Sequence, residues 1–128
     1  MSMTQMQNKD GDFILRVNFL DSNGAPAQIP DTVEIRISAD RGTGVFEAAY
    51  QADGECKNCR LAESGVDVFV SLSRNPIGKG RIIVETISHI HDDSFPSGER
   101  LQRSVASTSV FLWDGASDGG ICVTGQII

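Results

Sequence analysis

The chain has 128 residues, the size of one ordinary domain, which can bury a core without metal ions or disulfide bonds. Its formal net charge is −6 and its 11 lysines and arginines form no basic run, which argues against binding to nucleic acid backbones. No stretch reaches the roughly 20 apolar residues of a membrane-spanning helix. The first residues also lack the apolar core of a signal peptide. We therefore expect synthesis in a cytoplasm, with no nucleic acid or membrane partner.

Residues 1–11 are polar and aperiodic, which predicts a mobile lead-in before a single domain over residues 12–128. Two strands are expected first, at 12–20 and 32–39, because apolar side chains alternate with others along both. The core side of these strands is expected to hold Phe13, Leu15, Val17, Phe19, Val33, Ile35 and Ile37. The connection 21–31 contains an Asn-Gly pair and two prolines, so we expect a loop at one end of a sandwich rather than a tight hairpin.

The same reasoning predicts further strands at 45–51, 56–63, 66–72, 81–91, 101–113 and 121–128. Val66, Val68, Val70 and Leu72 form one of the clearest alternating rows, and Cys59 with Leu61 is the expected inward set of the weak strand 56–63. The Gly-Lys-Gly sequence at 78–80 is interpreted as a hairpin turn, and the loop at 91–100 is expected to fold Phe95 back as a plug.

No segment of helical length carries apolar residues at i, i+3, i+4 and i+7, and no internal repeat is visible. Seven or eight short strands separated by Gly, Asp, Asn and Pro turns predict an all-β sandwich of antiparallel strands. A closed barrel with the same number of strands is the structural alternative.

Cys56 and Cys59 have CxxC spacing, which is found in zinc half-sites and in redox pairs. Cys122 and a histidine would have to complete a zinc site, although they lie far away in the sequence. Residues three apart on a strand point to opposite faces unless a turn or bulge intervenes. The pattern therefore favours one buried cysteine and one turn cysteine, with metal binding as the alternative.

His89 and His91 lie at i and i+2 of a predicted strand, followed by Asp92 and Asp93. This places two imidazoles on one face, as a pair of metal ligands would require. Because no third ligand has a clear spacing, the pair is interpreted as polar residues at a strand end. The chain also lacks GxSxG, HExxH and P-loop motifs, so no catalytic residue and no cofactor is predicted.

Three stretches carry a family resemblance: FLDSNGAPAQIP, DVFVSLSRNPIGKGRIIVE and HDDSFPSGERLQRSV. They resemble the immunoglobulin-like N-terminal domains of upper baseplate and tail-appendage proteins from phages and prophages of gut Bacteroidetes. The matching positions are 21–24, 76–84 and 93–98. The resemblance implies an immunoglobulin-like sandwich of about seven or eight strands and a non-enzymatic structural protein. Such a protein would be made in the bacterial host cytoplasm and incorporated into the virion. It would form a homo-oligomer and bind other virion proteins.

Two other functions remain open from the residues themselves. A sandwich can bind carbohydrate or another surface ligand through loops, with Trp113, Tyr50 or Phe95 as a stacking platform. A small metal-binding or redox protein would instead use Cys56 and Cys59, with Cys122, His89 and His91 as further ligands.

Overall fold

The computed structural model describes residues 5–114, which form eight strands and no helix. The strands are β1 (Gln5–Asn8), β2 (Asp12–Asn18), β3 (Thr32–Ala39), β4 (Val45–Gln51), β5 (Cys59–Leu61), β6 (Gly65–Ser71), β7 (Gly80–His91) and β8 (Glu99–Trp113). The predicted strand at 121–128 lies outside the described residues. The prediction of an all-β protein is confirmed over the described part of the chain.

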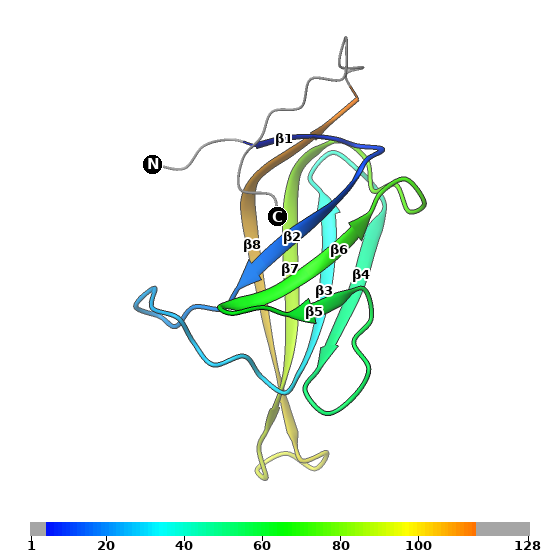
Figure 1. The fold of residues 1–128 in the computed structure, drawn as a ribbon. Coiled ribbons are helices and arrows are strands. Elements are labelled where there is room, and N and C mark those ends of the chain that lie inside the picture. Colours follow the sequence, from blue (N-terminus) through cyan, green and yellow to red (C-terminus); the bar gives the residue numbers. More distant parts are fainter. Residues whose placement is uncertain (1–4, 115–128) are drawn as a thin grey trace.

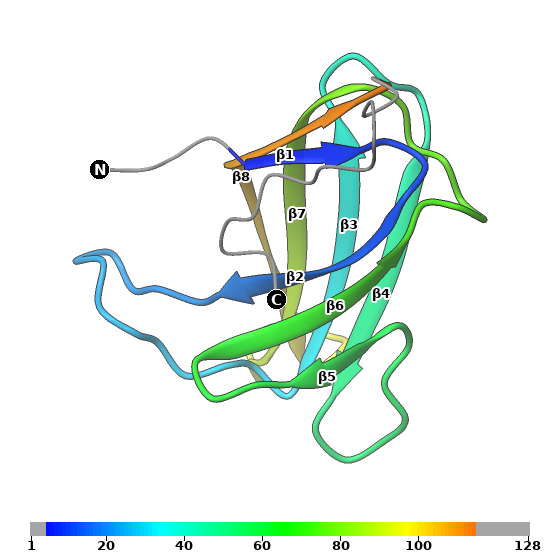
Figure 2. The same ribbon diagram turned by 45° about the horizontal axis from the view of Figure 1, so that its top comes forward.

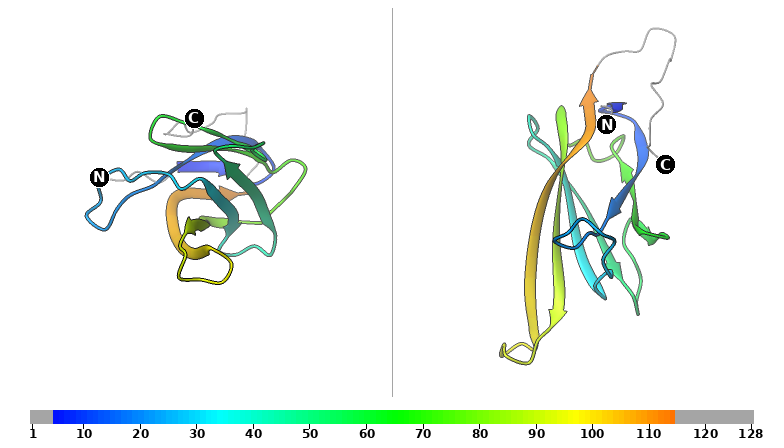
Figure 3. Two further views of the ribbon diagram at one scale, coloured as in Figure 1. Left: turned by 90° about the horizontal axis from the view of Figure 1, so that it is seen from below. Right: turned by 90° about the vertical axis from the view of Figure 1, so that its left-hand side faces the viewer.

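The strands form two sheets that face each other as in a sandwich (Figures 1 and 2). The larger sheet has the order β1-β8-β7-β3-β4, and the smaller sheet has the order β2-β6-β5. All pairs are antiparallel except β1 with β8, which are parallel. The two layers are seen edge-on in the right-hand view of Figure 3.

The core fills the space between the sheets, and the alternation of apolar residues explains which side chains enter it. Val33, Ile35 and Ile37 on β3 are fully buried, as are Val66 and Val68 on β6. The predicted core residues Phe13 and Leu15 are also buried, while Val17 and Phe19 are partly buried against the core. The inward row of β7 consists of Ile82, Val84, Thr86 and Ser88, all buried.

Several local predictions need correction. A parallel strand, β1, lies within the segment predicted as a lead-in, because Gln5–Asn8 pair with Val110–Trp113 of β8. Leu61 was expected inside but is exposed, since β5 has only three residues and only Cys59 reaches the core. Phe95 is exposed at the tip of the β7–β8 hairpin rather than folded back as a plug.

The connection between β6 and β7 is not a hairpin turn, because these strands belong to different sheets. It lies against the β3–β4 turn: Asp40 N donates to Arg81 O at 3.0 Å, and Arg41 N donates to Lys79 O at 3.1 Å. A Cβ atom on Gly42 would lie 1.9 Å from the carbonyl oxygen of Ile77. The two turns therefore meet backbone against backbone, which only a glycine permits.

The chain changes sheets at Asn58, between β4 and β5. Lys57 exchanges two backbone hydrogen bonds with Ala49 on β4, at 2.8 and 3.0 Å. Asn58 then has a φ of 57°, in the left-handed region that Asn tolerates, and β5 begins at the next residue. This corner lies inside the CxxC sequence.

Candidate interaction surface

The β7–β8 hairpin forms an arm that extends beyond the smaller sheet (Figures 1 and 3). The first nine residues of β8 are exposed on both faces. β1 pairs only with Val110–Trp113, so within residues 5–114 no strand lies beside the outer edge of β8 over residues 99–107. An unpaired edge of this length offers a row of backbone donors and acceptors to another strand.

Apolar side chains accompany this edge. Leu101 and Val105 are 61% and 60% exposed on the outer face of β8. They lie opposite His89 and Glu85 of β7. The resulting surface mixes apolar and charged side chains, as protein-binding surfaces commonly do.

Two ionic clusters lie on the same outer face. Glu85 on β7 forms ion pairs with Arg36 on β3, at 3.6 Å, and with Arg103 on β8. His89 lies between two glutamates: Nε2 is 2.9 Å from Glu34 of β3, and Nδ1 is 2.8 Å from Glu99 of β8. The hydrogen bonds to Glu34 and then to Glu99 raise the pKa of His89, because both stabilise the imidazolium.

His89 and His91 do not converge on one site. His91 has a side chain that is 81% exposed and pairs with Asp93 at 3.2 Å, while both ring nitrogens of His89 contact glutamates. In the described part of the chain, no group of three or more His, Cys, Asp or Glu residues is arranged to hold a metal ion.

The cysteines of the CxxC sequence lie on either side of the corner at Asn58. Cys59 is buried and donates from Sγ to Ala49 O at 3.1 Å, while Cys56 is exposed and its Sγ lies 3.7 Å from Gln51 O. Burial, with a smaller effect from Cys56, raises the pKa of Cys59 to about 11. A thiol with a pKa in this range is protonated at neutral pH. Cys122 lies outside the described residues.

The three aromatic residues considered for stacking do not form a platform. Tyr50 is buried in the core, Phe95 lies at the tip of the arm, and Trp113 lies at the opposite end of β8.

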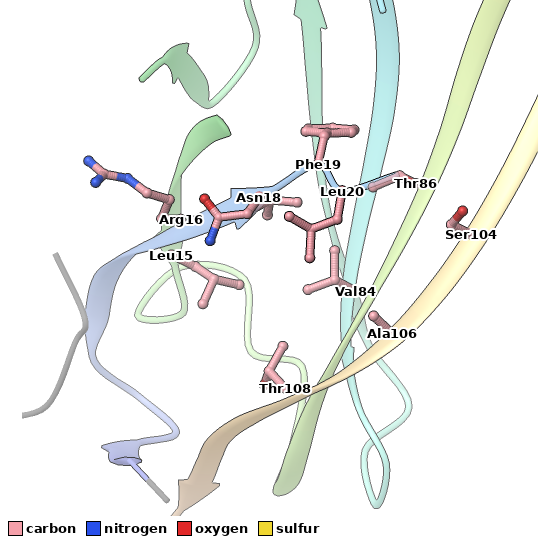
Figure 4. Close-up of a pocket in the computed structure, with 11 residues that line it drawn as sticks. Leu15, Arg16, Asn18, Phe19, Leu20, Val84, Thr86, Ser104, Ala106 and Thr108 are labelled. Atoms are coloured by element: carbon pink, nitrogen blue, oxygen red, sulfur yellow. The ribbon is translucent and has the colours of Figure 1, made fainter. Parts of the chain in front are cut away.

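A groove opens between β2 of the smaller sheet and the β7–β8 pair of the larger sheet (Figure 4). Its volume is about 390 Å³. Leu15, Phe19, Val84, Ala106 and Thr108 line it, so the groove is mainly apolar with a few hydroxyl groups. It is continuous with the core and marks the side of the sandwich that the described residues leave open.

A charge cluster lies behind this groove, on the outer face of the smaller sheet. Asp67 of β6 is almost fully buried and accepts a hydrogen bond from Arg16 Nε at 2.7 Å, while Arg60 lies at 3.6 Å. The hydrogen bond from Arg16 holds the pKa of Asp67 below its usual value. Arg60 also stacks over Phe69, 5.2 Å from its ring centre. These groups satisfy one another within the sheet.

The ionic clusters of the larger sheet do not follow from the sequence pattern. Glu34, Arg36 and Glu85 do occupy the polar positions of their alternating strands, which is the signal that the sequence contains. Their partners follow only from the strand order and register, which the alternation does not specify.

Comparison with known proteins gave no match to a family model, a curated protein or a solved structure. No helix long and apolar enough to cross a membrane occurs within residues 5–114.

Proposed function

We propose that this protein is a non-enzymatic structural component of a phage or prophage particle. In this proposal it is a baseplate or tail-appendage adaptor that assembles through the edge and outer face of β8. The observation that carries the proposal is the arm, whose nine-residue edge is exposed on both faces and has no strand beside it among residues 5–114. The resemblance of 21–24, 76–84 and 93–98 to phage baseplate proteins supplies the biological setting.

We further propose that the sandwich is immunoglobulin-like. Support comes from the strand order: β3, β7 and β8 correspond to strands C, F and G of one immunoglobulin sheet, and β2, β6 and β5 to strands B, E and D of the other. The inter-sheet disulfide of antibody domains has no counterpart, since β2 and β7 contain no cysteine. Leu15 and Val84, which lie across the groove from each other, occupy that part of the core instead.

The experiment measures self-association by sedimentation velocity at micromolar concentrations. We expect oligomers, and we expect Val105→Glu to weaken their association by about tenfold or more, which corresponds to about 1.4 kcal/mol. The reason is that a carboxylate replaces an apolar contact beside the pairing edge. Val45→Glu is the matched control because Val45 is 53% exposed on β4, the opposite edge of the same sheet.

A purely monomeric protein that also binds no purified tail or baseplate protein from the same genome would contradict this role. If Val105→Glu and Val45→Glu weakened self-association equally, the contact would not lie at β8. Mass spectrometry of purified particles tests the expected location in the virion directly.

A further inference from the structure

We propose that two copies of this chain pair through residues 99–107 of β8, antiparallel to each other and related by a two-fold axis at Arg103. The larger sheets of the two copies would then join into one continuous sheet. This pairing rests on the assembly through β8 proposed above, and it names the partner of that edge as a second copy. Three features of β8 point to it: the direction of its backbone groups, the limits of its free edge and the side chains along it.

The backbone groups at the free edge of β8 belong to the odd-numbered residues. Asp92 N donates to Gly98 O at 2.9 Å, so these two residues form a hydrogen-bonded pair at the tip of the arm. From there the register of β7 with β8 runs without a shift as far as Ser107. Hydrogen-bonded and non-hydrogen-bonded pairs alternate along an antiparallel ladder. The residues whose N–H and C=O groups point away from β7 are therefore Glu99, Leu101, Arg103, Val105 and Ser107.

The free edge has definite ends. β1 occupies the same edge of β8 from Val110 onward, and β8 begins at Glu99. Among residues 5–114, no strand lies beside the nine exposed residues between these limits (Figure 1). A two-fold axis that uses the whole stretch in both copies passes through its middle residue, Arg103. An axis at Leu101 or at Val105 would leave part of each edge unpaired.

The side chains along this edge complement themselves around that axis. Leu101 of each copy would lie opposite Val105 of the other, and these side chains are 61% and 60% exposed in the single chain. Both apolar pairs would lose contact with water. The two Arg103 side chains would meet at the axis, where each is already ion-paired with Glu85 of its own copy. An axis one residue to either side would instead place Leu101 or Val105 opposite Arg103.

Two complementary variants test the position of the axis by sedimentation velocity. Leu101→Glu and Val105→Lys should each associate about tenfold more weakly than wild type, because each dimer then holds two charges opposite apolar side chains. A mixture of the two variants should regain the association. In the mixed dimer one contact becomes a glutamate opposite a lysine, and the other stays a leucine opposite a valine.

A mixture of Leu101→Glu with Leu101→Lys is the matched control. It should not regain the association, because position 101 does not face itself across an axis at Arg103. Both substituted positions are exposed in the single chain, so circular dichroism should show the wild-type fold for all three variants.

Amide hydrogen exchange of the wild-type chain, measured by NMR, tests the backbone pairing separately. The amides of Leu101, Arg103 and Val105 should be protected at millimolar concentration and lose this protection on dilution to micromolar concentration. Those of Gln102 and Ser104 point toward β7 and should stay protected at both concentrations.

The outcomes distinguish this pairing from the proposed function. A complementary mixture that recovers no more than the control mixture would overturn the pairing. Protection of the odd-numbered amides that survives dilution would also overturn it, because their partner would then lie in the same chain. A wild-type chain that stays monomeric would overturn the pairing by itself. The proposed function fails only if that monomer also binds no tail or baseplate protein.

Discussion

His89 shows how one side chain connects three strands of the larger sheet. It lies on β7, and its two ring nitrogens contact Glu34 on β3 and Glu99 on β8. The imidazolium form donates a hydrogen bond to each glutamate, whereas the neutral ring keeps only one N–H. Protonation of His89 therefore strengthens the contacts that link β7 to β3 and to the start of β8.

This coupling predicts a pH dependence of stability that His89→Gln removes. The folded pKa of His89 is raised above its ordinary value of 6.5, so its contribution is present below pH 6.5 and is lost as pH rises through the folded pKa. We expect wild type to exceed His89→Gln in unfolding free energy by about 0.5–1 kcal/mol at pH 5.5 and by less at pH 9. Urea unfolding at the two pH values measures this difference.

His91→Gln is the control for this experiment, because the side chain of His91 is exposed and its ion pair with Asp93 is exposed too. An exposed pair of this kind contributes little, so we expect the control to match wild type at both pH values. A wild-type advantage over His89→Gln that grows from pH 5.5 to pH 9 would show that the link to Glu34 and Glu99 is wrong.

At the level of elements, the β3–β4 turn and the β6–β7 connection hold the two sheets together at one end. Gly42→Ala should lower the free energy of unfolding by about 3 kcal/mol, at the upper end of overpacking effects, because the new methyl group meets backbone. Gly54→Ala is the matched control, since its methyl group meets only the flexible end of Gln51, and its effect should stay within about 0.5 kcal/mol. Urea unfolding of both variants measures the two losses in free energy of unfolding. Equal losses would mean that the two turns do not pack as described.

Most of the strands could be predicted from the sequence, but their partners could not. The ranges 32–39 and 45–51 agree with β3 and β4, because alternating apolar residues between turns define a strand locally. β1 has no apolar alternation and is fixed by pairing with β8, a contact between distant parts of the chain. The candidate surface was missed for the same reason, since Glu34, His89 and Glu99 meet only through the register of three strands.

At the level of the whole molecule, the two sheets share one core. Ile35, the central inward residue of β3, is fully buried, and so is Val68 at the centre of β6. Four of the seven connections between consecutive strands pass from one sheet to the other. Neither sheet has a second core of its own among residues 5–114, so we expect the sheets to unfold together.

Ile35→Ala tests this cooperativity, because the substituted residue itself belongs to the larger sheet only. We expect a loss of about 2–5 kcal/mol in the free energy of unfolding, as for other buried isoleucines. The amides of β6, in the smaller sheet, should lose the same protection against hydrogen exchange as those of β3, since both exchange through global unfolding. Val45→Ala, on the exposed side of β4, should change neither. Wild-type exchange of the β6 amides in Ile35→Ala would mean that the smaller sheet is stable by itself, and the single shared core would be wrong.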